Sequence, residues 1–459
     1  MKRTRATRVG LVSLGCPKNL VDSEVMLGLL AEAGWQITDR PELADVIIVN
    51  TCDFIGPAAE ESRQTLAEMA RMKRRGRCQA LIAAGCMPQR RGETLLAEFP
   101  EIDAIVGVGD FPRLPALIGA ALAGERVVAV ESPPFLYDDR TPRLRATPPW
   151  SAYVKIADGC AHPCTFCVIP RLRGPYRSRE ADSISREVGE LVVQGVAEIN
   201  LIAQDTTGYG LDRGERGGLA SLLRALEVEV GAGRSHAGGE NPPRTTPPWI
   251  RLLYCYPQRV TTELLDVIAG SAHICHYLDV PFQHADPEVL RRMRRAGSGE
   301  RHLQLIERIR RRMPDAALRT SLIVGFPGET EEAFSRLADF LTAARFDRAG
   351  VFRYSREEGT PAADLPGQVP PDEIEARYHH LMRLQQRISA EGNARWVGRE
   401  LEVLVVERQP DRVIARSFRD APEVDGLVHV SGGRAAPGDF LRVRITAAGP
   451  YDLVATPAS

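Results

Sequence analysis

The sequence contains no apolar segment that approaches the ~18–20 residues needed by a membrane-spanning helix. The apolar stretch nearest the start, residues 9–14, is interrupted by Gly10 and Ser13 and is shorter than the ~7 residues of the shortest secretion signals. Neither sign of charge is in excess, because the formal net charge is −1 over 459 residues. Such a balance gives no general attraction to nucleic acid or to membranes. These absences favour a cytoplasmic protein with no membrane partner.

Cysteine is too scattered for a secreted disulfide scaffold. The nine cysteines are an odd number and are spread over the whole chain, whereas disulfide-stabilised domains are short and dense in cysteine. In a cytoplasmic protein, clustered thiols are more often metal ligands or reactive groups.

Length predicts about three domains, and 44% apolar with 26% charged residues is ordinary for a globular chain. Over residues 6–125, short apolar segments alternate with helical patterns, which indicates an open parallel α/β sheet. We expect strands at 9–14, 45–49, 80–84 and 103–106, with helices at 19–33, 57–73, 90–99 and 114–122. A link rich in proline and charge, residues 132–149, follows.

Residues 150–370 repeat this alternation through six strand–helix units. Six units predict a partial (β/α)6 barrel, a relative of the eight-unit barrel. We expect its strands at 153–157, 198–203, 249–253, 277–280, 318–324 and 349–354. The segment 231–248 is rich in Gly, Pro, Ser and Thr, and we interpret it as a surface insertion without an assigned role.

The last part of the chain, residues 393–459, has a different pattern. After a helix expected at 372–391, short apolar segments at 402–406, 413–415, 427–430 and 440–445 are separated by Gly and Pro. Such short strands predict a small OB-like β-barrel. The expected fold class is therefore α/β for the first two domains, followed by this barrel.

The densest cysteine group is Cys160, Cys164 and Cys167, a C-x3-C-x2-C run that follows the first predicted barrel strand. Barrels of this kind place their chemistry at that end of the strands. Three thiolates can hold three irons of a four-iron cluster and leave the fourth iron open. The alternative is a structural zinc site with His162 as fourth ligand. Structural zinc sites usually pair two ligand couples, and no second couple lies nearby in the sequence.

A second group is spread along the chain. Cys16, Cys52 and Cys86 each lie a few residues beyond the end of a predicted strand of the first domain. Since the carboxyl ends of parallel strands share one edge of a sheet, we expect these three thiols to meet there. The sequence therefore predicts a second cluster. The remaining cysteines are interpreted as packed thiols, namely Cys78, Cys255 and Cys275.

Two glycine-bearing loops are candidates to hold an organic cofactor. Gln204 and Asp205 end one barrel strand, and Gly325 follows another. Glycine lets a backbone approach a ligand closely. Each loop alone is a weak signal, and its value comes from its position at the barrel.

The C-x3-C-x2-C run, with Phe166 before its last cysteine, resembles the radical S-adenosylmethionine superfamily. Together with the spread cysteines and a terminal barrel of the TRAM type, the chain resembles the methylthiotransferases of that superfamily over nearly its whole length, residues 231–248 excepted. The segments 15–24 and 416–426 resemble the branch that acts on ribosomal protein uS12. The transfer-RNA enzymes tend to carry Gln-Met in place of Pro17-Lys18.

This resemblance implies two 4Fe-4S clusters, with S-adenosylmethionine bound at the cluster of the C-x3-C-x2-C run. It implies methylthiolation of the β-carbon of an aspartate of uS12, a small-subunit ribosomal protein. A radical from S-adenosylmethionine removes the hydrogen, and the second cluster supplies or carries the sulfur, which a second S-adenosylmethionine methylates. A reductant and a sulfur donor are implied partners. No side chain is nominated as a general acid or base. The expected ligands and cofactor contacts are Cys160, Cys164 and Cys167; Cys16, Cys52 and Cys86; and Phe166, Gln204, Asp205 and Gly325.

Two other functions remain open at this point. One is the same chemistry on an adenosine of transfer RNA, and the other is a non-catalytic iron–sulfur sensor that binds RNA or a ribosome. From residue 396 to the end there are eight Arg and nine Asp plus Glu, so the net charge is 8 − 9 = −1. A barrel that grips RNA is expected to be basic, so this balance favours a basic protein substrate. We expect Glu423 and Asp425 to be exposed and to attract it.

Overall fold

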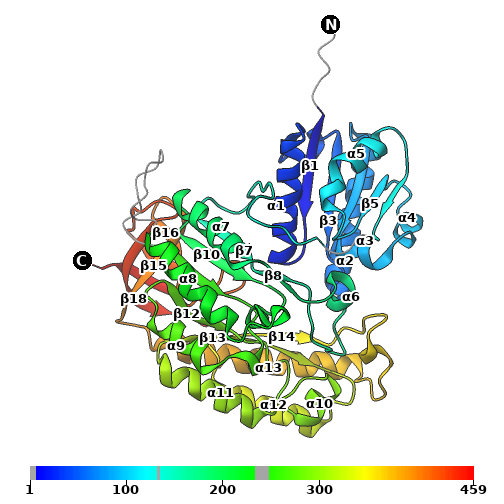
Figure 1. Ribbon diagram of the computed structural model, residues 1–459. Coiled ribbons are helices and arrows are strands. Elements are labelled where there is room, and N and C mark those ends of the chain that lie inside the picture. Colours follow the sequence, from blue (N-terminus) through cyan, green and yellow to red (C-terminus); the bar gives the residue numbers. More distant parts are fainter. Residues whose placement is uncertain (1–6, 132–134, 233–247, 459) are drawn as a thin grey trace.

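The computed structural model describes residues 7–131, 135–232 and 248–458. The first domain is a parallel six-stranded sheet in the order β2-β1-β3-β4-β5-β6, with helices packed on it (Figure 1). Its central strands β3 and β4 are buried at every residue, as a parallel sheet with both faces covered requires. The elements are β1 (Arg8–Ser13), α1 (Pro17–Glu32), β2 (Gln36–Thr38), β3 (Val46–Thr51), α2 (Gly56–Arg75), β4 (Ala80–Gly85), α3 (Cys86–Arg91), α4 (Thr94–Glu98), β5 (Ala104–Val106), α5 (Leu114–Leu122) and β6 (Val127–Ala129).

The open α/β architecture expected for this domain is confirmed, with three differences in detail. The edge strands β2 and β6 were not predicted, because three residues each are too short to show an alternating pattern. The expected helix 90–99 is wrong as one element, since Gly92 at φ 55° separates α3 from α4. The third difference is that the link after β6 forms ion pairs with both flanking domains. Its Arg143 binds Glu24 of α1 and Glu187 of the second domain.

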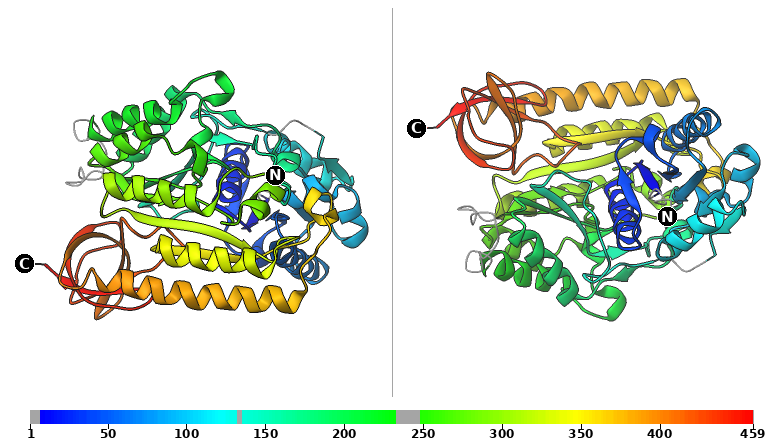
Figure 2. Two further views of the ribbon diagram at one scale, coloured as in Figure 1. Left: turned by 90° about the horizontal axis from the view of Figure 1, so that it is seen from below. Right: turned by 90° about the horizontal axis from the view of Figure 1, so that it is seen from above.

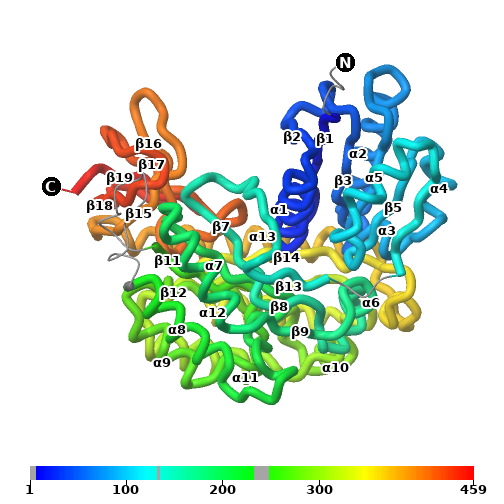
Figure 3. The backbone as a smooth tube through the Cα atoms, turned by 45° about the horizontal axis from the view of Figure 1, so that its top comes forward, coloured from blue at the N-terminus to red at the C-terminus, as the bar shows by residue number. Residues whose placement is uncertain are grey.

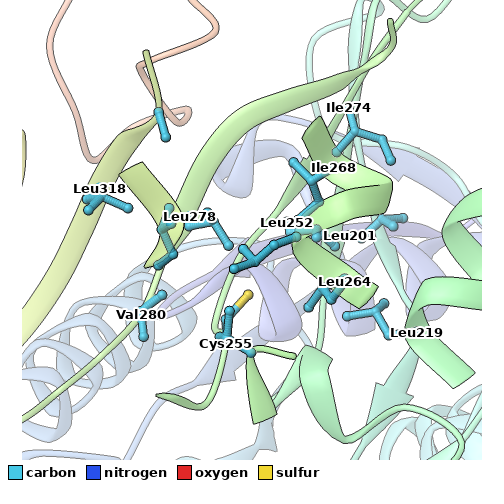
Figure 4. Packing of buried hydrophobic residues seen from close by; sticks show 14 of the residues in the cluster. Leu201, Leu219, Leu252, Cys255, Leu264, Ile268, Ile274, Leu278, Val280 and Leu318 are labelled. Atoms are coloured by element: carbon cyan, nitrogen blue, oxygen red, sulfur yellow. The ribbon is translucent and has the colours of Figure 1, made fainter. Parts of the chain in front are cut away.

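The second domain is an open parallel sheet in the order β14-β13-β12-β11-β10-β7, so the partial barrel is confirmed. One face packs its apolar side chains against the outer helices, and Figure 4 shows Leu252, Cys255, Leu264 and Leu278 in this core. The strands are β7 (Ser151–Lys155), β10 (Glu198–Ile202), β11 (Trp249–Leu252), β12 (Ile274–Asp279), β13 (Ala317–Val324) and β14 (Arg348–Arg353). The helices are α6 (Ile169–Arg173), α7 (Ala181–Val193), α8 (Gly218–Ala232), α9 (Thr262–Gly270), α10 (Pro287–Arg292), α11 (Gly299–Arg312) and α12 (Glu331–Ala344), and a short antiparallel pair, β8 (Ala157–Asp158) and β9 (Arg177–Ser178), flanks α6.

Most of the expected insertion 231–248 lies outside the described residues, since α8 ends at Ala232 and the chain is described again from residue 248. No helix in the described ranges is both long and apolar enough to cross a membrane.

The third domain is a closed five-stranded barrel in the order β15-β16-β17-β19-β18, which confirms the small β-barrel. The fifth strand was not predicted. The strands are β15 (Glu400–Arg408), β16 (Arg412–Ser417), β17 (Val428–Ser431), β18 (Phe440–Ala448) and β19 (Leu453–Pro457).

The segment that follows β16 docks this barrel onto the second domain. The Tyr277 hydroxyl donates to Asp425 Oδ2 at 2.6 Å, and the Asp425 side chain is only 1% exposed. Arg348 pairs with Asp420 at 2.7 Å. The expectation that Asp425 is free to attract a partner is therefore wrong, because the carboxylate is used inside the molecule; Glu423 is exposed.

The long helix α13 (Pro371–Ala394) connects the second domain to the third (Figure 2). Near its start, Arg377 binds Glu329 at 2.9 Å. Near its end, the Asn393 amide donates to Gly449 O of the terminal barrel at 3.0 Å. The helix is thus fixed at both ends.

Candidate active site

The C-x3-C-x2-C run forms a loop between β8 and α6. It begins at Gly159, whose φ is 77° and where a Cβ atom would lie 2.0 Å from Pro175 O, so only glycine fits this turn. Cys160 N donates to Gly174 O at 3.2 Å, and Thr165 N donates to Met293 O at 3.1 Å. These bonds fasten both halves of the loop to neighbouring segments, so Cys160, Cys164 and Cys167 are presented on a fixed backbone.

A stacked pair of rings, His162 on Tyr256, supports the same loop. The His162 ring lies 3.7 Å from the Tyr256 ring, centroid to centroid, and its Nε2 is 2.7 Å from Asp205 Oδ2. Arg259 also binds Asp205 Oδ2, at 2.6 Å, and Thr207 donates to Oδ1. Both carboxylate oxygens of Asp205 are therefore occupied by protein groups. His162 belongs to this support and is not placed as a ligand.

The three thiols of the loop are close enough to affect one another electrostatically. Burial, together with the thiolates of Cys164 and Cys160, raises the pKa of Cys167 to about 12. Arg295 opposes this, with its guanidinium 3.7 Å from Cys164 Sγ. A positive iron centre would favour the thiolate form of all three, so the donor set fits a cluster.

The other residues expected to touch an organic cofactor lie around this loop. Gln204 Nε2 donates to Asp158 Oδ1 at 3.1 Å, while its Oε1 is buried with no hydrogen-bond partner among the described residues. Phe166 packs edge-on against Phe326, with 6.4 Å between centroids, and Phe326 directly follows Gly325. An unsatisfied acceptor beside the loop fits a polar ligand. The contacts of Phe166, Gln204, Asp205 and Gly325 with a cofactor stay predictions.

The second cysteine set comes together at the carboxyl edge of the first sheet. Cys16, Cys52 and Cys86 follow β1, β3 and β4, which are neighbours in that order. A Cβ atom on Gly15 would lie 3.1 Å from Cys52 Sγ. The expected convergence at one edge is thus what the topology produces.

The pKa values of these three thiols are shifted in different directions by burial, neighbouring charges and backbone N–H groups. Burial works against ionisation of Cys16, but Lys18, Arg173 and the backbone N–H groups of Asn19 and Lys18 outweigh it and lower its pKa. Burial, together with the thiolates of Cys86 and Cys16, raises the pKa of Cys52 to about 12. The surroundings therefore favour ionisation of Cys16 at the start of α1, whereas burial disfavours ionisation of Cys52 and Cys86.

Arg173 joins the two cysteine sets. It lies at the end of α6, and its guanidinium reaches Cys86 Sγ at 3.8 Å, Asp22 of α1 at 2.8 Å and Asp158 at 3.1 Å. Lys155 pairs with the same two carboxylates. This buried network fixes the first domain on the mouth of the second, as Figure 3 shows for α1 above the barrel. Sequence reasoning missed it, because Asp22 and Arg173 are 151 positions apart and no local pattern links them.

Lys18 is a second residue that the sequence did not single out. It lies in the first turn of α1, and its Nζ is 3.1 Å from the centroid of the Tyr254 ring, two residues beyond the end of β11. Tyr254 has φ 65°, a left-handed conformation that is costly for a bulky side chain. Lys18 thus spans from the second cysteine set to the barrel.

No three His, Cys, Asp or Glu side chains in the described ranges are grouped to hold a single metal ion. The fit to clusters rests on the shared edge, the mutual electrostatic effects and the nearby cations.

Three segments of the chain match known families. Residues 8–107 match the family described as Uncharacterized protein family UPF0004, residues 154–341 match the Radical SAM superfamily, and residues 397–457 match the TRAM domain.

Full-length relatives are also similar. The chain is 50% identical over 448 residues to the ribosomal protein uS12 methylthiotransferase RimO of Heliobacterium modesticaldum, covering 97% of this chain and 94% of that protein. It is 48% identical to the protein of the same name from Pelotomaculum thermopropionicum, covering 97% and 98%. The solved structure of the radical S-adenosylmethionine methyltransferase TsrM from Kitasatospora setae, with cobalamin and a 4Fe-4S cluster bound, has a TM-score of 0.56 at 18% identity over 78% of this chain and 77% of that one. That likeness concerns the fold alone.

Proposed function

Because the chain belongs to the family of ribosomal protein uS12 methylthiotransferases, we propose that it transfers a methylthio group to the β-carbon of an aspartate of uS12. The observation that carries this proposal is the identity of 50% across 97% of the chain. The contacts of Arg173 support it: its guanidinium reaches Cys86 Sγ of one set and Asp158, two residues before Cys160 of the other, and the reaction needs both clusters within reach of one substrate atom.

We assign Cys160, Cys164 and Cys167 to one 4Fe-4S cluster and Cys16, Cys52 and Cys86 to another. When bound, these clusters and S-adenosylmethionine supply an electron, a carbon-centred radical, the sulfur and the methyl group. No general acid or base is assigned, because the described side chains act on position and on solvent access.

The protein's own residues hold the cluster-bearing loop in place and exclude water from the contact between the domains. Gly159 and the bonds of Cys160 and Thr165 fix the loop that carries the first cluster. The stack of His162 on Tyr256 prevents that loop from tilting. Arg173 pairs with Asp22 in the buried contact between the first two domains, which excludes water from that contact.

The remaining parts of the proposal concern partners. A one-electron reductant and a sulfur donor are required by the chemistry, and the cytoplasm is the expected site, since uS12 is a ribosomal protein. The net charge of −1 on the terminal barrel is compatible with a basic protein partner.

The test is anaerobic reconstitution with iron and sulfide, followed by turnover with S-adenosylmethionine, a reductant and both uS12 and transfer RNA. Mass spectrometry should find the methylthio group on one aspartate of uS12. Modification of transfer RNA alone would replace the substrate while keeping the chemistry. If no S-adenosylmethionine is cleaved under any reducing condition, a non-catalytic sensor becomes the better description.

A further inference from the structure

Buried cations in this molecule are almost always paired with carboxylates. Ten Lys and Arg residues are buried among the described residues. Eight of them form an ion pair with Asp or Glu, as burying a charge requires. The two exceptions are Lys18 and Arg295, and each lies beside one of the two cysteine sets.

Arg295 and Lys18 differ in the groups that their charged ends contact. Arg295 donates to Cys164 Sγ at 3.7 Å and to Pro281 O at 2.7 Å, and it also lies over the Tyr256 ring. The Lys18 ammonium has no hydrogen bond or ion pair with any described residue; its Nζ rests on the face of Tyr254. A cation–π contact is weaker than an ion pair and leaves the ammonium hydrogens available.

The surroundings of Lys18 connect it to both cysteine sets, since it lies two residues after Cys16 and rests on Tyr254, two residues before the Tyr256 that stacks on His162 of the other loop. Its ammonium interacts electrostatically with Cys16 of one set, with Asp279, which Arg319 already pairs, and with Asp158, the second residue before Cys160 of the other set. Arg173 and Lys155, the other buried cations of this region, are already neutralised by Asp22 and Asp158. Lys18 is therefore the buried positive charge with capacity for an added anion.

The chemistry of the proposed substrate supplies such an anion. In an aspartate, the carboxylate carbon is bonded directly to the β-carbon. A β-carbon held between the two cysteine sets brings its carboxylate into the same space, next to Lys18. A carboxylate there would form a desolvated, charge-assisted hydrogen bond.

We propose that Lys18 binds the carboxylate of the substrate aspartate and makes the site selective for an acidic side chain over a neutral one. This inference rests on the proposed function. It assigns Lys18 a contact with the substrate, while the face of the Tyr254 ring positions the ammonium.

The test measures binding without turnover. The anaerobically reconstituted enzyme, with S-adenosylmethionine and no reductant, is titrated with uS12 and with uS12 whose target aspartate is changed to asparagine, and fluorescence anisotropy gives each Kd. The wild type should prefer the aspartate form by roughly 10- to 100-fold. Lys18→Met should reduce this ratio to about one, and Lys18→Arg should retain part of it. The matched control is Lys73→Met, since Lys73 pairs with Asp103 far along α2 and should leave the ratio unchanged.

Two safeguards keep the outcome decisive. The ratio is taken within each variant, so a fraction of inactive protein lowers both affinities alike, and Lys18→Gln serves as a second neutral variant if the methionine protein loads little iron. An undiminished preference in the neutral variants overturns the role of Lys18 while leaving the function in place. A wild type that modifies no uS12 overturns both.

Discussion

The two cysteine sets reach a similar arrangement by different routes. Cys160, Cys164 and Cys167 lie on one loop and depend on short-range backbone bonds. Cys16, Cys52 and Cys86 come from three adjacent strands and meet only when β1, β3 and β4 pair in register. The first set is therefore specified locally, and the second is specified by the sheet.

The difference also extends to charge. In the local set burial raises the pKa of Cys160 and of Cys167, whereas in the dispersed set the effect of burial on Cys16 is outweighed by Lys18, Arg173 and backbone N–H groups, which lower its pKa. One of these cations, Arg173, comes from the second domain. The dispersed set thus depends on domain docking as well as on its own sheet.

The largest expected effect separates the two sets. Replacing Cys160, Cys164 and Cys167 by Ala should remove about half the iron, since each cubane holds ~4 irons, and should abolish cleavage of S-adenosylmethionine. Replacing Cys16, Cys52 and Cys86 should also remove about half, yet leave cleavage intact without sulfur transfer. Iron assays and deoxyadenosine release are the measurements. Full iron content in the second variant would show that the dispersed cysteines hold no cluster.

The next effect breaks the connection between the sets. Arg173→Met leaves Asp22 and Asp158 with Lys155 as their remaining shared partner, and breaking a buried pair costs roughly 3–5 kcal/mol. Urea unfolding should show this loss, and more S-adenosylmethionine should be cleaved per methylthio group transferred. The control is Arg186→Met, because Arg186 is solvent-exposed and loss of its pair with Asp139 should change stability little. Equal losses in the two variants would contradict a special role for Arg173.

A smaller effect tests the dependence on strand ends. Gly85 precedes Cys86 at φ 93°, and a Cβ atom there would lie 2.2 Å from Asn50 Oδ1. Gly85→Ala should cost about 2–3 kcal/mol and reduce the iron of the dispersed set, measured after reconstitution. Gly119→Ala in α5 meets no atom within 4 Å and should stabilise by about 0.5–1 kcal/mol. Unchanged iron in Gly85→Ala would mean that the edge tolerates the shift.

The smallest effect on iron comes from a site away from both sets. Burial raises the pKa of Glu198, but Arg416 and Arg251 outweigh it and lower the pKa from 4.5 to about 2. Because the folded pKa is depressed, the stabilisation is present above pH 4.5 and is lost as the pH falls toward 2. Glu198→Gln should therefore be destabilised by roughly 3 kcal/mol at pH 7, and its gap to the wild type in urea unfolding should narrow between pH 5 and pH 3. Iron per chain at neutral pH should stay at the wild-type value, which separates general destabilisation from loss of a cluster.

The sequence was sufficient where chemistry follows from short spacing or from strand ends. The C-x3-C-x2-C run could be identified without knowledge of the fold, and the shared sheet edge of Cys16, Cys52 and Cys86 followed once the strands before them were placed. That the two sets bind clusters stays a prediction. The three-domain architecture followed from the change of periodicity along the chain.

The sequence was insufficient where contacts join distant positions. The pair of Arg173 with Asp22 and the contact of Lys18 with Tyr254 leave no local pattern. The sequence around Asp425 is typical of an exposed turn. In the structure its carboxylate is buried and accepts a hydrogen bond from Tyr277, 148 positions away. Such residues are ordinary in composition, and their roles arise from tertiary packing alone.

The helix α13 sets a fixed spacing between the two ends of the molecule. Its 24 residues span about 36 Å, and its two anchoring residues, Arg377 beside Glu329 and Asn393 beside the terminal barrel, are separated by about 24 Å of that length. Adding one residue in its middle would turn the barrel by about 100° relative to the catalytic mouth and advance it by about 1.5 Å, whereas adding seven would nearly restore its orientation at a greater reach. If a ribosomal protein binds the terminal barrel while its aspartate enters the site of the second domain, this helix sets the distance between the two contacts. Its length then decides how far from the docking surface a modifiable residue can lie.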